Sequence, residues 1–347
     1  MRIGIIFHKD PFVPPSGIDL IRLRAIAGAL IRRGVDAEII APAAREGFLA
    51  GEIPVLPLAA LSKGRKYDLV KTCYHFSIQL TGKYRGPLIS RIVRVVDEQL
   101  PERDASMRRT LLECQRLIGK RAKALIVNNV ENEERWLRLY GGKLSVAAIP
   151  NGCPSHIPPI RSNPYGAGGA PVLFLGSLAA PRMIGLLNEL ASRLRDRCRI
   201  HIVGSNKAHL YGEGKPPELN PLIADHGELP EEEVWDYVRH ARMGIALAAG
   251  PHVFDNDISK IYTYLRGGLP VLSEELIANN HLLAQTHLGN IFAYGNATDM
   301  AIKAAGLLER PPTQWIQSAM ALMGREHSWE QRVTVLLSLI HRVLGNS

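Results

Sequence analysis

Two basic residues lie where the sequence predicts that a helix begins. Arg182 directly follows Pro181, a residue suited to the first helical position, and Lys260 follows Ser259, a residue type common at the N-cap. The N-terminal end of a helix carries partial positive charge, so a cation there costs about 0.3–1 kcal/mol. Phosphate binds both cations and free helix N–H groups and would remove this cost. Either these two residues form an anion site, or they are solvated surface cations. In the second case, salt screens the repulsion between each cation and the positive end of its helix.

The turn after the first apolar run is a second place where a ligand could approach the backbone. It is rich in proline and ends at Ser16 and Gly17. Glycine permits a close approach to the backbone, and the alternative is an ordinary surface loop. The turn matches neither GxGxxG nor GxxxxGK[ST], and neither pattern occurs elsewhere in the chain. This argues against a dinucleotide-dependent dehydrogenase and against a P-loop NTPase.

Short apolar runs alternate with amphipathic stretches, which predicts an α/β fold with parallel sheets covered by helices. We expect strands at Arg2–His8, Ala37–Ala41, Asp68–His75, Ile89–Val96, Ala124–Asn128, Ser145–Ile149, Val172–Gly176, Ile200–Gly204, Met243–Ala249, Leu269–Ser273 and Asn290–Tyr294. A linker rich in Pro and Gly, Asn151–Pro171, divides them into two halves. Ligands of such sheets bind outside the carboxyl ends of the strands, which is where Arg182 and Lys260 are expected.

The composition is that of an ordinary globular protein with an excess of basic residues. The 347 residues are 46% hydrophobic, enough for two domains, and 42 Lys and Arg against 33 Asp and Glu give a net charge of +9. This charge favours an anionic partner such as nucleic acid, anionic lipid or a phosphorylated substrate. The four cysteines form no CxxC pair, so reduced thiols are expected rather than disulfides or a zinc site. No apolar run approaches the ~18–20 residues that cross a bilayer, and the expected location is cytoplasmic.

Several stretches, taken in order, resemble glycosyltransferases of the GT-B fold, particularly a large group of retaining hexosyltransferases. They are Ile149–Gly152, Val172–Leu178, Arg199–Ser205, His226–Val238 and Ile258–Ser273. The last resembles the family's K-x-x-E-Y-L-A-x-G-x-P-V donor-site helix and strand. The resemblance covers almost the whole chain and implies two Rossmann-like doubly wound domains that face each other across a cleft.

The sequence departs from the family pattern at two positions. Ser177 replaces the Arg of the family's G-R-L-x-x-x-K-G segment, and Arg182 lies close to its Lys. Thr263 replaces the Glu that holds the nucleotide ribose. A smaller inverting group, similar to a bacterial glucuronosyltransferase, tolerates a neutral residue there and carries an Arg-Val-x-Asp segment, which Arg94–Asp97 resembles.

The resemblance implies roles for individual residues. Gly176, Ser177, Arg182, Ile258, Ser259, Lys260 and Thr263 would bind the donor, with Ser16 and Gly17 in a donor or acceptor loop. In an inverting enzyme Asp97 would be the base that takes a proton from the acceptor hydroxyl, with Glu98 and Asp10 as weaker alternatives. His75 stands where family members often contact the donor sugar. A solvated Asp97 and a structural His75 are the alternatives, and Tyr264 is expected in the core.

The function implied is transfer of a hexosyl or hexuronosyl group from a UDP- or GDP-linked sugar to a glycan or lipid-linked acceptor, with no metal or other cofactor. The expected domains are residues 1–155 on the acceptor side and residues 170–325 on the donor side, with a C-terminal helix at 326–347 that could pack back on the N-terminal domain. The basic amphipathic segment Leu20–Arg33 suggests attachment to an anionic membrane face, unless it packs on a sheet. The alternatives are an inactive GT-B scaffold and a nucleotide-sugar 2-epimerase. No pattern supports nucleic-acid binding.

Overall fold

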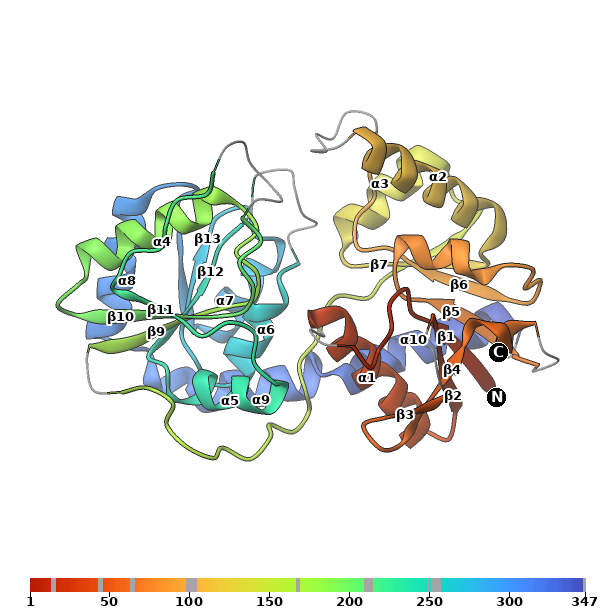
Figure 1. Cartoon of the computed structure of the whole chain (residues 1–347), viewed down its shortest axis with the longest axis horizontal. Coiled ribbons are helices and arrows are strands. Elements are labelled where there is room, and N and C mark those ends of the chain that lie inside the picture. Colours follow the sequence, from red (N-terminus) through yellow and green to blue (C-terminus); the bar gives the residue numbers. More distant parts are fainter. Residues whose placement is uncertain are drawn as a thin grey trace. The chain divides into compact units, whose positions relative to one another are not determined.

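The chain folds into two α/β units (Figure 1). The structure, a computed structural model, describes residues 1–13, 17–42, 46–62, 66–97, 105–166, 169–208, 215–248, 250 and 257–345. The first unit consists of Met1–Asn151 completed by Trp329–Ser347, and the second of Gly152–Ser328. The chain therefore leaves the first unit once and returns to it at its end.

The first unit is built on an eight-stranded sheet in the order β3-β4-β2-β1-β5-β6-β7-β8. All neighbours pair in parallel except β3 with β4. The strands are β1 (Arg2–Ile6), β2 (Asp36–Ala41), β3 (Gly47–Leu49), β4 (Ile53–Pro57), β5 (Leu69–Thr72), β6 (Leu88–Arg91), β7 (Ala124–Val127) and β8 (Ser145–Ala148). The helices are α1 (Gly17–Arg32), α2 (Ala105–Arg121), α3 (Val130–Tyr140) and α10 (Trp329–Leu344), with 3-10 turns η1 (Leu58–Leu61) and η2 (His75–Thr81).

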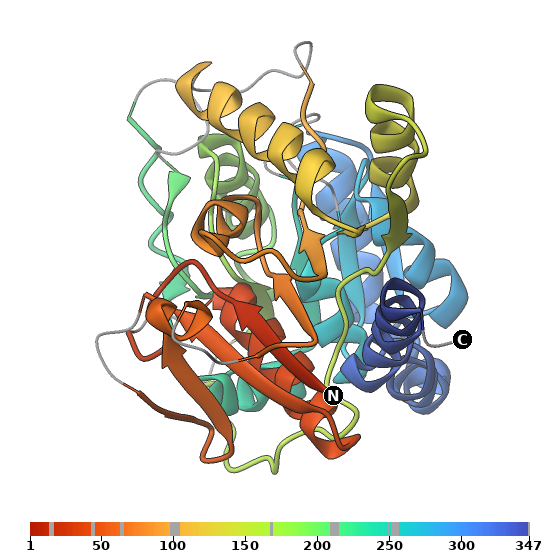
Figure 2. The same ribbon diagram turned by 90° about the vertical axis from the view of Figure 1, so that its right-hand side faces the viewer.

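Alternate residues of these strands face two different helix layers. Ile3, Ile5 and Leu69 pack with α1 and α10, whereas Ile6 and Val70 pack with α2 and α3. Figure 2 faces this unit and shows α2 as the long gold helix on one side of its strands. A sheet that is covered on both faces needs apolar residues throughout its strands, which explains why they read as continuous apolar runs.

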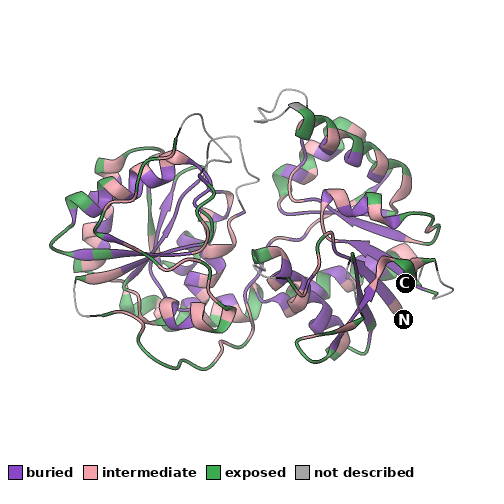
Figure 3. Cartoon of the chain, in the orientation of Figure 1, coloured by how far each residue is buried: buried purple, intermediate pink, exposed green. Residues whose placement is uncertain are grey.

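The second unit is a six-stranded, entirely parallel sheet in the order β11-β10-β9-β12-β13-β14. Its strands are β9 (Ala170–Leu175), β10 (Cys198–Val203), β11 (Ile223–Asp225), β12 (Met243–Ala246), β13 (Val271–Glu274) and β14 (Gly289–Phe292). The helices are α4 (Pro181–Arg193), α5 (Glu231–His240), α6 (Ser259–Arg266), α7 (His281–Thr286), α8 (Ala297–Glu309) and α9 (Ile316–Glu326), with 3-10 turns η4 (Ala278–Asn280) and η5 (Thr313–Trp315). Helices α4 and α8 cover one face, and α5, α6, α7 and α9 cover the other, so the strands are buried (Figure 3).

The expected α/β class and the two parallel-sheet domains are confirmed, but several strand bounds differ. The run Ile89–Val96 is a strand only as far as Arg91, and the run Asp68–His75 only over Leu69–Thr72. Ile92, Val95 and Val96 are buried without being strand residues, since an apolar run shows burial and not backbone conformation. The short strands β3, β4 and β11 were not predicted.

The apolar residues of α1 are used inside the first unit. Leu20, Leu23, Ile26 and Leu30 are buried against the sheet and α10. The amphipathic pattern of this helix therefore reflects packing on a sheet, and attachment of the protein to an anionic membrane face stays a prediction. None of the described helices is long and apolar enough to span a membrane.

Candidate functional site

The order of strands in the second unit reverses at β9. From this central strand the chain builds outward through β10 and β11 on one side and through β12, β13 and β14 on the other. Helices that follow the two sets of strands lie on opposite faces of the sheet, and a crevice opens at the carboxyl ends of the two central strands. Gly176 follows β9 at this position, and Ala248 lies just beyond β12. The residues around these two positions form the candidate site.

Two glycine turns lie against each other at this edge of the sheet. The Gly176 N–H donates to the Val203 carbonyl over 2.8 Å, and a Cβ on Gly204 would lie 2.2 Å from the Gly176 carbonyl oxygen. Only glycine fits so close to another backbone at position 204. The φ of Gly204, +148°, also excludes most other residues. The serines that follow the two glycines are brought together, with 3.0 Å between the hydroxyls of Ser177 and Ser205.

Lys260 lies in the first turn of α6 and its side chain reaches the start of the Gly176 turn. Its Nζ is 3.8 Å from the centroid of the Phe174 ring, and a Cβ on Gly176 would lie 3.8 Å from its Cε. Among the residues that the structure describes, no carboxylate lies within ion-pair distance of this ammonium. Burial lowers the pKa of Lys260 to about 7. A desolvated amine without an anionic partner is suited to bind an anion.

The start of α6 is fixed by a buried amide. Asn279 is 2% exposed, accepts a hydrogen bond from the Ile258 N–H and donates one to the Ile258 carbonyl, both over 2.9 Å. The hydroxyl of Thr263 lies 3.5 Å from the Ser259 carbonyl one turn earlier. Ile258, Ser259, Lys260 and Thr263 are therefore adjacent, as expected of residues at the beginning of one helix.

Tyr264 ties this helix to the central strands. Its ring is fully buried, as expected, and its hydroxyl accepts a hydrogen bond from the Leu175 N–H over 2.7 Å. The same hydroxyl is 3.2 Å from the carbonyls of Leu173 and Ile245. Because Lys260 and Tyr264 are one turn apart, this anchor positions the ammonium relative to β9 and β12.

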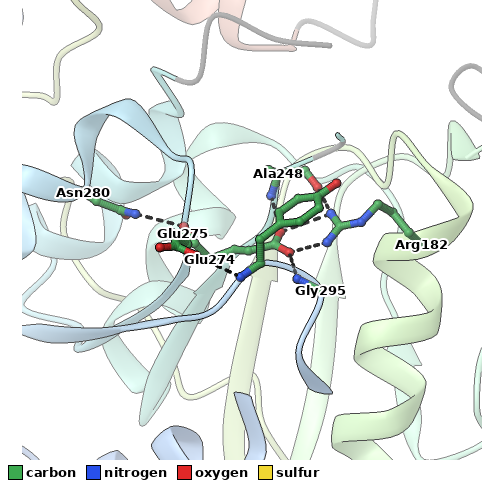
Figure 4. A network of polar contacts seen from close by, with 7 residues as sticks. Arg182, Ala248, Glu274, Glu275, Asn280 and Gly295 are labelled. Carbon is green, nitrogen blue, oxygen red and sulfur yellow. Dashed lines mark hydrogen bonds and ion pairs between the residues drawn. The ribbon is translucent and has the colours of Figure 1, made fainter. Parts of the chain in front are cut away.

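Arg182 is held by a carboxylate that the sequence analysis did not single out. Its guanidinium forms an ion pair with Glu274, in which Nη1 and Oε2 are 3.1 Å apart, and donates to the Ala248 carbonyl (Figure 4). Glu274 has no exposed surface and also accepts from the N–H groups of Ala248 and Gly295, each over 2.9 Å. The guanidinium carbon lies 4.3 Å from the centroid of the Tyr294 ring. The charge of Arg182 is thus neutralised within the unit, in contrast to that of Lys260.

His75, which was predicted to act in the first unit, follows the central strand β5. His75 is buried at the start of η2, and its Nε2 donates to the Arg94 carbonyl over 2.7 Å. Its Nδ1 is buried and has no hydrogen-bond partner in the described chain. Burial lowers the pKa of His75 to about 4, so the ring is neutral at pH 7 and Nδ1 is an acceptor.

The remaining predicted residues of the first unit are placed only in part. Asp97 is half-buried and lies beyond β6, three residues after Arg94. Gly17 is exposed at the start of α1 with a φ of +50°, and Asp10 accepts from the Phe12 N–H over 2.9 Å. Ser16 and Glu98 lie outside the described residues.

The structure adds residues that sequence reasoning missed. Glu274, Asn279 and Ser205 shape the candidate site, although none was predicted to belong to it. A signal was present for two of them, because Glu274 directly follows a predicted strand and Gly204-Ser205 repeats the Gly176-Ser177 pattern. Asn279 belongs to no motif, and its role depends on a fold contact across 21 residues.

We predict that Arg182→Met destabilises the protein, because it leaves the buried Glu274 carboxylate without its cation. The expected loss is about 3 kcal/mol in the free energy of unfolding, measured by urea denaturation. The control is Arg193→Met on the same helix, whose exposed pair with Glu189 contributes less than about 0.5 kcal/mol. If Arg182→Met were as stable as this control and only nucleotide affinity fell, Arg182 would bind the ligand directly.

The comparisons with known proteins concern the fold. No protein-family model matches the sequence, and no curated protein matches it significantly. Solved structures do match over both units. Sucrose-phosphate synthase of Thermosynechococcus elongatus has a TM-score of 0.73 at 15% identity, with 100% of each chain covered. HepE of Anabaena in complex with UDP-glucose has a TM-score of 0.73 at 16% identity, covering 98% of this chain and 100% of that one.

A third solved structure is similar over nearly the whole chain. WaaG, a glycosyltransferase involved in lipopolysaccharide biosynthesis, has a TM-score of 0.68 at 14% identity, covering 99% of this chain and 100% of that one. Identities this low establish the architecture rather than the substrate. Together with the two doubly wound parallel sheets, they show that this chain has the fold of the GT-B glycosyltransferases.

Proposed function

We propose that this protein is a glycosyltransferase that moves a hexosyl or hexuronosyl group from a UDP- or GDP-linked sugar to a glycan or lipid-linked acceptor. The observation that carries the proposal is Lys260. Its desolvated ammonium lies at the start of a helix, at the point where the strand order reverses, and no described carboxylate neutralises it. Similar solved structures support the choice of ligand, since HepE binds UDP-glucose in one crystal structure and UDP and glucose in another.

Glycosyl transfer from such a donor breaks the bond between the anomeric carbon and a diphosphate oxygen. Negative charge develops on the departing diphosphate, and preorganised cations and N–H groups lower the energy of that state. In our proposal the Lys260 ammonium and the backbone N–H groups of Ser259 and Lys260 stabilise this charge, and no metal is needed. Gly176 lets the backbone approach the phosphates, and the hydroxyls of Ser177 and Ser205 donate to their oxygens.

Arg182 has a positioning role in this proposal. It forms an ion pair with Glu274. Glu274 in turn accepts hydrogen bonds from the Ala248 N–H after β12 and from the Gly295 N–H, so this pair fixes the positions of both segments. Thr263 takes the position of the family's ribose-binding Glu, where its hydroxyl offers one neutral hydrogen bond in place of a charged one.

The first unit would supply one group that acts on the acceptor and one that contacts the donor sugar. We propose that Asp97 takes the proton of the attacking acceptor hydroxyl if the reaction inverts. We also propose that Nδ1 of His75, which has no hydrogen-bond partner among the described residues, accepts a hydrogen bond from a hydroxyl of the donor sugar. The neutral state of His75 at pH 7 fits an acceptor of hydrogen bonds rather than a cation.

We predict that Lys260→Met weakens binding of nucleotide diphosphates by at least about tenfold, because a charge-assisted contact to phosphate is lost. Isothermal titration with UDP, GDP and ADP measures the affinity, and release of nucleotide diphosphate from the corresponding sugars measures turnover. Lys215→Met, which removes an exposed lysine of the same unit, is the control. Absence of binding and of turnover across the panel would contradict the proposal and favour a scaffold role.

The pH dependence of binding provides an independent check on Lys260. The diphosphate binds the protonated amine, whose pKa is about 7 without ligand and is raised by the bound anion. Affinity should therefore weaken by up to about tenfold for each pH unit above 7, until the pKa of the complex is passed. Titration from pH 7 to 9 measures this, a range in which the terminal phosphate, with a pKa near 6, stays ionised. Equal slopes for wild type and Lys260→Met would contradict the assignment.

We also propose that the cytoplasmic protein contacts an anionic membrane face when the acceptor is lipid-linked. The support is the net charge of +9 together with Arg109, Arg116 and Lys120, which are exposed on α2. Vesicles with anionic lipid should pellet the protein at low salt and release it at high salt, whereas neutral vesicles should not. Failure to pellet with anionic vesicles at low salt would rule this contact out.

A further inference from the structure

The segment that leads to Asp97 is buried without being part of a strand. β6 ends at Arg91, yet Val95 and Val96 have no exposed surface. Each buried backbone N–H and C=O group needs a hydrogen-bond partner, and inside a sheet the neighbouring strands supply it. Beyond the end of β6 the partners must come from elsewhere. Because the segment directly precedes the predicted base, these partners also decide where that base lies.

Gln115 of α2 binds the backbone of Val96 through both ends of its side-chain amide. It has no exposed surface, its Oε1 accepts from the Val96 N–H over 2.8 Å, and its Nε2 donates to the Val96 carbonyl over 2.9 Å. A residue of an adjacent antiparallel strand would make the same pair of bonds. Nε2 also donates to the Tyr140 hydroxyl over 2.9 Å, which orients the amide. Gln115 therefore fixes the backbone one residue before Asp97.

Other side chains hold the rest of this segment. The Val95 N–H donates to Oδ1 of the buried Asn132 over 2.7 Å, and Arg135 donates to the Val95 carbonyl over 3.3 Å. The Arg94 carbonyl accepts from Nε2 of His75. Side chains thus bind five backbone groups of residues 94–96, which is unusual for a segment outside regular structure. One end of this fixed segment contacts His75, and the other leads into Asp97.

We propose that Gln115 is a positioning residue that places the Asp97 carboxylate through the backbone of Val96. The inference rests on the proposed function, in which Asp97 takes the proton of the attacking hydroxyl. A base must lie about 2.6–3.2 Å from the hydroxyl that it serves, and a displacement of about 1 Å can lower a rate by about two orders of magnitude. A rigid support behind the base keeps it within that tolerance. The Gln115 amide is buried and bound to Val96 and Tyr140, so it acts through Asp97 and not on the substrate.

A purely structural role for Gln115 would have different consequences. If the amide only satisfies a buried backbone, its loss should lower the rate by the same factor whether or not Asp97 carries a carboxylate. If the amide positions Asp97, its loss should have no further effect once that carboxylate has been replaced. Residues that act as one unit are non-additive in this way, so a double-mutant cycle separates the two roles.

The test measures kcat for release of nucleotide diphosphate, with water as acceptor, from the most active donor in a panel of UDP-, GDP- and ADP-sugars. It compares wild type, Gln115→Met, Asp97→Asn and the double variant. We expect Gln115→Met to lower kcat at least about tenfold, while its affinity for UDP in isothermal titration stays within about twofold. In the Asp97→Asn background, Gln115→Met should change the residual kcat by less than about twofold.

Two further variants separate this effect from a loss of stability. Tyr67→Phe removes a buried hydroxyl that donates to Glu38 over 2.9 Å just before β5, and it should keep the kcat of wild type. Tyr140→Phe removes only the bond that orients the Gln115 amide. It should fold even where Gln115→Met does not, and it should lower kcat by a smaller factor, only when Asp97 is present. Urea denaturation shows which variants are folded.

The outcomes distinguish this inference from the proposed function. An equal loss of kcat in both backgrounds would overturn the positioning role and leave glycosyl transfer intact. The same holds for wild-type kcat in folded Gln115→Met or, where that variant does not fold, in Tyr140→Phe. Wild-type kcat in Asp97→Asn would also overturn it, because Asp97 would then not be the base. Absence of turnover by wild type with every donor contradicts the proposed function, and this inference with it.

Discussion

The carboxylate of Glu274 organises the edge of the second unit at which we place the nucleotide. It lies at the end of β13 and binds α4 through Arg182, the end of β12 through the Ala248 N–H, and the turn after β14 through the Gly295 N–H. A fully buried carboxylate is favourable only when several donors surround it. This requirement fixes the start of α4, the end of β12 and the turn after β14 relative to one another. Such rigidity is what electrostatic stabilisation of a leaving group requires.

The two units share a sheet topology but differ in where a cation without a carboxylate partner lies. In each, a parallel sheet reverses its strand order at a central strand, and cations gather near the carboxyl ends of the strands beside it. In the second unit the cation without a carboxylate is on a helix and next to a glycine turn. In the first, among the described residues, it is Lys71 of β5, within the sheet interior. The buried cation of the second unit has an energetic cost in the absence of an anion, and that cost is the physical argument for a ligand there.

The sequence was most informative where function depends on local position along the chain. Gly176, Arg182 and Lys260 were found because strand ends and helix starts can be read from periodicity. The partner of Arg182 was missed because Glu274 is 92 residues away, and only the folded sheet brings the two together. Gln115 was missed for another reason, since a glutamine within a helix looks solvated in a sequence. It is buried because the fold brings residues 94–96 against α2.

The return of the chain to its first unit has a consequence for biosynthesis. Trp329, Val333, Leu336 and Leu339 of α10 fill the same hydrophobic core as the strands at the amino terminus. A ribosome releases these residues only after the whole second unit has been made. The core of the first unit therefore stays incomplete until α10 has been made. The second unit consists of contiguous residues and can complete its own core first. Folding order in this protein is expected to run opposite to the order of synthesis.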